Sequence, residues 1–132
     1  MRCFIAIDLP EEIKNELSLI QKRLPAAEMK FVEQENLHLT LIFLGDLPDF
    51  QVDMVKQALK EIKSDKFKAY LKGLGVFPNE DFIRVVWVAL EPKELLRELY
   101  NKISDKIKSL GLKIDERFES HVTLSRVKPI QD

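Results

Sequence analysis

The 132-residue sequence predicts a fold of mixed helices and strands that contains an internal repeat. Apolar residues recur at helical spacing in three segments, and segments typical of strands lie between them. A unit of strand, proline and helix occurs twice, and so does a strand that begins His-x-Thr-Leu. Pro10 and Pro92 are 82 residues apart, and His38 and His121 are 83 apart. These two nearly equal offsets favour duplication over coincidence.

The first repeat, about residues 1–82, opens with a buried strand at 3–7 and a helix after Pro10, because proline is tolerated in a first helical turn. Four apolar residues at helical spacing define this helix: Ile13, Leu17, Ile20 and Leu24. The later elements are a short strand at 30–32, a strand at 37–44, a helix from Pro48 and an extended segment at 67–77.

The second repeat, about residues 83–132, opens with a strand at 83–90 that forms a hairpin with the preceding extended segment. A helix follows Pro92, and its apolar residues at every fourth position are Leu95, Leu99, Ile103 and Ile107. A short extended piece at 112–114 and a last strand at 121–127 complete it. The sequence ends 11 residues after His121, whereas an equal copy needs about 30 to 50 more. We therefore expect a truncated or a naturally short chain.

Composition limits the class of protein. Apolar residues make up 45% of the sequence, enough for one hydrophobic interior, and the net charge of −1 argues against extended binding along a nucleic-acid duplex. The single cysteine, Cys3, cannot form an internal disulfide, which fits a reducing cytoplasm. No segment approaches the roughly 20 apolar residues of a membrane span.

The two histidines of the chain occupy the same position in two motifs, His38-Leu39-Thr40-Leu41 and His121-Val122-Thr123-Leu124. Side chains alternate between the two faces of a strand, so each imidazole should lie beside a threonine hydroxyl. Strict alternation adds Ile42 and Ser125 to these faces and puts Phe43 on the opposite, apolar face. The repeat predicts that both motifs face one cleft.

Two imidazoles and two hydroxyls suit the cleavage of a phosphodiester. One histidine takes a proton from the attacking water while the other gives a proton to the leaving oxygen. The hydroxyls can bind the non-bridging phosphate oxygens. One His-x-Thr motif alone is a weak signal, but two in matching positions of a repeat favour a shared site.

A metal site is not expected. Zinc needs three or four protein ligands, and the sequence offers two histidines. The acidic residues near the motifs look like solvated loop charges: Glu33, Glu35, Asp115, Glu116 and Glu119. The sequence also lacks a glycine-rich phosphate loop and a nucleotide-binding fingerprint, so we expect no cofactor.

Six segments resemble the two-histidine (2H) phosphoesterase superfamily: residues 1–8, 35–41, 43–45, 75–78, 84–87 and 121–127. The branch that they resemble most is the RNA 2′,3′-cyclic phosphodiesterases, also called 2′-5′ RNA ligase-like proteins. The resemblance runs along essentially the whole chain. It implies a bilobal, pseudo-symmetric α+β fold in which two antiparallel sheets flank a central cleft, with the helices outside.

The resemblance also implies an activity and roles for the motif residues. The activity is hydrolysis of 2′,3′-cyclic phosphate ends of RNA, tRNA-like or oligoribonucleotide, to 2′-phosphates, with ATP-independent 2′-5′ ligation as the reverse reaction. It implies no metal and no nucleotide cofactor. His38 would be the proton donor and His121 the proton acceptor, with Thr40 and Thr123 binding phosphate. The sequence alone does not order the two histidines.

The roles of several other residues have two interpretations. Arg126 can bind phosphate, as the resemblance implies, although strict alternation puts it on the face opposite His121. Arg84 is either a residue of the cleft or a surface charge. Phe4, Phe43 and Trp87 can stack on a base, but their strands favour core packing.

The resemblance fails at the C-terminus, because the family continues with a further helix and a strand hairpin. We therefore expect an exposed sheet edge and self-association through it. Two other functions stay open: a phosphodiesterase for another small cyclic nucleotide, or a nucleotide- or RNA-binding module inactivated by truncation.

Overall fold

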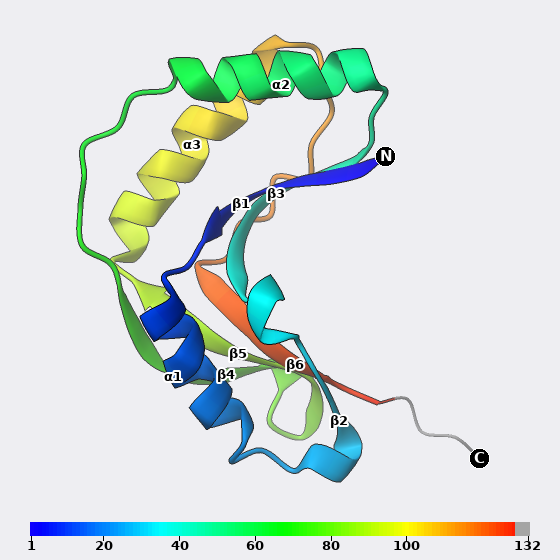
Figure 1. Ribbon diagram of the computed structural model, residues 1–132, viewed down its shortest axis with the longest axis vertical. Coiled ribbons are helices and arrows are strands. Elements are labelled where there is room, and N and C mark those ends of the chain that lie inside the picture. Colours follow the sequence, from blue (N-terminus) through cyan, green and yellow to red (C-terminus); the bar gives the residue numbers. More distant parts are fainter. Residues whose placement is uncertain (129–132) are drawn as a thin grey trace. The chain divides into compact units, whose positions relative to one another are not determined.

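The computed structural model describes residues 1–128. Its helices and strands are, in chain order, β1 (Arg2–Asp8), α1 (Glu11–Gln21), β2 (Met29–Phe31), β3 (His38–Asp46), α2 (Asp49–Glu61), β4 (Tyr70–Asn79), β5 (Phe82–Glu91), α3 (Lys93–Ser109) and β6 (His121–Val127). Two short 3₁₀ helices, η1 (Ala26–Glu28) and η2 (Gln34–Asn36), flank β2. The strands form a two-stranded sheet, β1-β3, and a four-stranded sheet, β2-β6-β5-β4 (Figure 1). The predicted α+β class is confirmed.

The chain divides into two compact units, which we describe separately. The first contains Met1–Ile7, Thr40–Tyr70 and Glu91–Ser120, and the second contains Asp8–Leu39, Leu71–Leu90 and His121–Asp132. The two repeats, with a boundary near residues 82–83, are defined by sequence similarity, and this division stays a prediction. The last residues of the second repeat, 129–132, lie outside the described part of the chain. No helix within residues 1–128 is long and apolar enough to cross a membrane.

In the first unit, α2 lies across the C-terminal end of α3 (Figure 1), where Lys106 and Glu61 form an ion pair at 2.7 Å. The buried face of α3 contains Leu96, Tyr100, Ile103, Ser104 and Ile107. The predicted Leu95 is instead 38% exposed. A helix has 3.6 residues per turn, so a row of every fourth residue drifts around the helix, and only its C-terminal members are buried.

The segment between α3 and β6 contains no strand, so the extended piece predicted at 112–114 does not join a sheet. The ring of Phe118 stacks on that of Tyr100, with centroids 4.8 Å apart. The guanidinium of Arg97 lies 5.3 Å from the Phe118 ring, and it also donates to the Phe118 carbonyl at 3.2 Å. Packing against α3, rather than strand pairing, therefore holds this segment.

In the second unit, β6 lies between β2 and β5 and pairs antiparallel with both (Figure 1). Helix α1 packs against β6. Its buried residues are Lys14, Leu17 and Gln21, while Ile13 and Ile20 of the predicted apolar repeat are half-buried. Leu24 lies beyond the end of the helix. The polar pair is buried because Lys14 binds the Asp8 carboxylate and a backbone carbonyl, while Gln21 binds two backbone carbonyls.

Candidate active site

The second motif occupies the start of β6, where its alternation is clear. His121 lies opposite Ala89 of β5, and Thr123 lies opposite Trp87. Directly opposed residues of paired strands share a face, so the imidazole and the hydroxyl lie on the same side of the sheet. Val122, between them, is fully buried on the other side.

A β-bulge interrupts β6 immediately after this pair. Val86 lies opposite Ser125, and the next residue of β5, Trp87, lies opposite Thr123, so Leu124 is an extra residue in β6. Leu124 and Ser125 are both fully buried in consequence. The expectation that Ser125 shares the face of Thr123 is wrong: its Oγ donates instead to Sδ of Met29 at 3.3 Å.

The bulge brings Arg126 to the face of the motif. Arg126 lies opposite Val85, which shares a face of β5 with Trp87 and therefore with Thr123. Strict alternation predicts that Arg126 lies on the other face of the sheet from His121. This prediction is wrong because it does not include the extra residue, Leu124. Arg126 is exposed.

Arg84 is not brought to this face. It precedes Val85 on β5 and so points to the other side of the sheet. Its guanidinium lies 4.8 Å from the centroid of the Phe82 ring. The structure therefore favours the interpretation of Arg84 as a surface charge.

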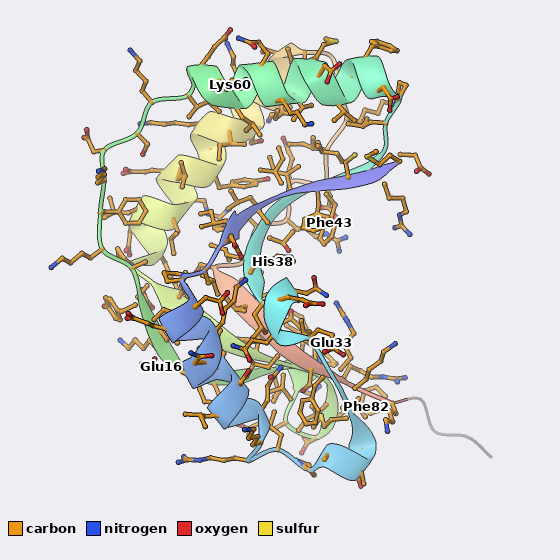
Figure 2. The ribbon with its side chains drawn as sticks, viewed as in Figure 1. Glu16, Glu33, His38, Phe43, Lys60 and Phe82 are labelled. Carbon is orange, nitrogen blue, oxygen red and sulfur yellow. The ribbon has the colours of Figure 1, made fainter. Side chains whose placement is uncertain are left out.

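The first motif begins β3, directly after η2, and Figure 2 labels His38 at this end of the strand. The seven residues that start at His38 have the same order of burial as the seven that start at His121: half-buried, buried, half-buried, buried, buried, exposed, half-buried. Thr40 is half-buried, two residues along β3.

The same order of burial shows that the predicted faces of Ile42 and Phe43 are wrong. Ile42 is 1% exposed and does not share the half-buried state of His38 and Thr40, while Phe43 is 63% exposed. Phe43 lies further along β3 (Figure 2), and its ring lies 6.2 Å from that of Phe4, which is 50% exposed. The expectation that Phe4 and Phe43 pack in the core is therefore wrong.

An ion pair lies beside His38. Nζ of Lys14 is 2.9 Å from Oδ1 of Asp8 and also donates to the Glu35 carbonyl at 3.3 Å. The Lys14 side chain is 5% exposed, whereas that of Asp8 is 80% exposed. Burial lowers the pKa of His38 below its ordinary value; the Asp8 carboxylate opposes this shift and the Lys14 ammonium adds to it.

Three charged neighbours of the motifs are not predicted by the sequence: Asp8, Lys14 and Lys30. Lys30 of β2 lies opposite Arg126 and so shares its face. A lysine in an amphipathic helix or a short strand is ordinarily a solvated charge, and no local pattern distinguishes these two. Only the strand register and the path of α1 reveal them.

Among the residues that the structure describes, no three histidine, cysteine, aspartate or glutamate side chains gather as a metal site would require. Two of the acidic residues near the motifs are already paired. Arg117 binds Asp115 at 2.7 Å and lowers the pKa of that carboxyl to about 2, and Glu116 pairs with Lys108. Both histidines belong to the second compact unit.

The sequence profile of the LigT-like phosphoesterases matches residues 7–87. The chain is 37% identical to the RNA 2′,3′-cyclic phosphodiesterase of Archaeoglobus fulgidus over 97% of its own length and 73% of that protein. It is also 37% identical to the protein of the same name from Methanocaldococcus jannaschii, over 100% of its own length and 75% of that protein.

Solved structures give the same result. The structure of TT0787 from Thermus thermophilus superimposes with a TM-score of 0.82 at 31% identity and covers 100% of this chain and 77% of that one. The structure of E. coli LigT complexed with 3′-AMP gives a TM-score of 0.77 at 29% identity, over 97% of this chain and 73% of that one. The profile match, the identities and the shared fold agree, and the chain belongs to the LigT-like phosphoesterase family.

Proposed function

We propose that this chain hydrolyses 2′,3′-cyclic phosphate ends of RNA to 2′-phosphates. The observation that carries the proposal is that the two histidines have the same position and burial. Each is half-buried at the start of a strand, and a half-buried threonine follows two residues later. The choice of substrate is supported by the relatives named RNA 2′,3′-cyclic phosphodiesterase. The chain is 37% identical to two of them and spans about three quarters of their length. The identical order of burial after each histidine supports the proposed repeats, about residues 1–82 and 83–132.

In the proposed reaction His121 accepts a proton from the attacking water, whose oxygen forms a new bond to phosphorus. The bond from phosphorus to the 3′-oxygen breaks, and His38 donates a proton to that oxygen. The product is a 2′-phosphate and a free 3′-hydroxyl. In the reverse, ligating direction the two histidines exchange roles.

The environment of His38 suits a proton donor whose imidazole becomes protonated when the anionic substrate binds. Burial lowers the pKa of the free imidazole, so the proton is held weakly when the site is empty. A bound phosphodiester is an anion, and a nearby negative charge favours the protonated form of histidine. Substrate binding therefore raises the fraction of His38 that can donate.

The other groups on the motif face of β6 suit a phosphate. The Thr123 hydroxyl can donate to a non-bridging oxygen, and the exposed Arg126 guanidinium can bind two oxygens at once. Thr40 is assigned the same role as Thr123 by its motif. Arg84 points to the other side of the sheet, so it serves as the matched control for Arg126.

The test is the hydrolysis of an oligoribonucleotide with a 2′,3′-cyclic end, in the presence of EDTA. We expect turnover in the wild-type chain, and a loss of about 10²-fold or more in His38→Ala and in His121→Ala. Arg126→Gln should raise KM while Arg84→Gln leaves it unchanged. Circular dichroism of each variant checks that it is folded.

Several results would contradict the proposal. Activity lost in EDTA would refute the metal-free reaction, and activity kept in either histidine variant would refute the pairing of acid and base. A preference for a small cyclic nucleotide over the RNA end would change the substrate class. Binding of the RNA without product would identify a binding module instead of an enzyme.

A further inference from the structure

Trp87, the single tryptophan of the chain, lies against the imidazole of His121. The two rings are stacked, with centroids 5.2 Å apart and an angle of 28° between their planes. Trp87 lies opposite Thr123, and His121 is the next residue but one on the same strand. The indole therefore extends from its own position on β5 across the motif face of β6.

The indole also lies against Gly75. This glycine is in β4, the other neighbour of β5 in the sheet. A Cβ atom added at Gly75 would lie 2.2 Å from both Cη2 and Cζ2 of Trp87. Real Cβ atoms do not approach other atoms this closely, so any side chain at position 75 must displace the indole.

The glycine is required here for space and not for backbone conformation. Gly73, two residues earlier on β4, has a φ of +71° and open space around its missing side chain. Gly75 has no such positive φ, but it has the indole against it. The two glycines of this strand thus have different roles, and the one at position 75 is explained by Trp87.

The indole acts here through packing. Its Nε1 is buried and has no hydrogen-bond partner among the described residues. A buried N–H without a partner is energetically unfavourable, and a phenylalanine would avoid that penalty. What a phenylalanine lacks is the outer ring of the indole, which contains the Cη2 and Cζ2 atoms that lie over Gly75.

We propose that Trp87, seated in the space left by Gly75, is a positioning residue that fixes the orientation of the His121 imidazole. The inference rests on the proposed function of His121 as the proton acceptor. A general base works only when its nitrogen points at the proton that it removes. Stacking on a flat indole restricts the rotation of the imidazole about its side-chain bonds, which serves this requirement.

The test is a cycle of variants at positions 75 and 87. Trp87→Phe removes the outer ring, and Gly75→Ala displaces the indole, so each single variant should lower kcat about 10- to 100-fold and change KM little. In the Trp87→Phe background, Gly75→Ala should have little further effect, because the atoms that it would strike are gone. Phe82→Leu, on the exposed end of the same strand, is the control and should keep full activity.

A spectroscopic measurement separates this inference from the proposed function. The chain has two histidines, so the imidazole proton resonances in NMR spectra are simple to assign. The indole ring current should shift the His121 protons upfield, and both Trp87→Phe and Gly75→Ala should move them back while those of His38 stay in place. This result is expected even if no RNA substrate is turned over.

Three results would overturn the inference. The first is that the His121 resonances do not move in either variant. The second is that both single variants keep kcat within about twofold of the wild type, which is below the cost of a misplaced catalytic group. The third is that the effects of Gly75→Ala and Trp87→Phe simply add, which would mean that they act separately.

Discussion

Replacing Gln21 by methionine tests how the strand that carries His121 is held by helix α1. Nε2 of Gln21 donates to the Val32 carbonyl and to the Leu124 carbonyl, both at 2.9 Å. Gln21 is 8% exposed, so these bonds are largely shielded from water. Leu124 is the bulged residue of β6, next to Thr123, and the glutamine thus ties α1 to the irregular point of the motif strand.

The expected loss follows from these two bonds. Methionine keeps the length and the packing of the side chain but donates nothing. The Leu124 carbonyl retains a donor, the Val32 amide at 2.9 Å, so it loses only the net value of one hydrogen bond, about 1 kcal/mol. The Val32 carbonyl, which is partly buried, loses the hydrogen bond from the Gln21 side-chain amide, and this loss costs about 1–2 kcal/mol. Gln21→Met should therefore lower the free energy of unfolding by about 2–3 kcal/mol.

The assay is urea denaturation followed by circular dichroism, with the free energy and the slope m fitted together. Gln57→Met is the matched control, because Gln57 is exposed on α2. The control should stay within about 0.5 kcal/mol of the wild type. If Gln21→Met is no less stable than Gln57→Met, the two hydrogen bonds do not hold β6 and the reasoning is wrong.

Three further predictions concern the motifs. Lys14→Met should raise the pKa of His38 and Asp8→Asn should lower it, and NMR titration of the imidazole protons measures both signs. Since the pKa of His38 is below 6.5 in the folded chain, the unfolded chain binds more protons just below that pH. Stability should therefore fall as the pH drops through this window, and urea denaturation of His38→Gln should show a weaker dependence. Thr123→Val should lower kcat by about 10²-fold, whereas Ser125→Ala, buried on the other face, should keep it.

Several elements were predictable because their signals are local. The strand predicted at 121–127 coincides with β6, and helices follow the three prolines as expected. Alternation of side chains also places His121 beside Thr123 without any knowledge of neighbouring strands. The burial of Lys14 and Gln21 could not be predicted in this way, because their partners are carbonyl groups and a carboxylate on other segments.

The sequence by itself determined the two His-x-Thr motifs, their place at the start of strands and the offset that relates them, because each depends on residue order and on the period of a strand. The tertiary structure decided which further groups join them. Arg126 reaches the face of His121 only because β6 pairs with β5 through a bulge at Leu124. Trp87 reaches His121 only because β4 presents a glycine beneath the indole. Both depend on the register between strands, which packing across the sheet selects and no single segment encodes.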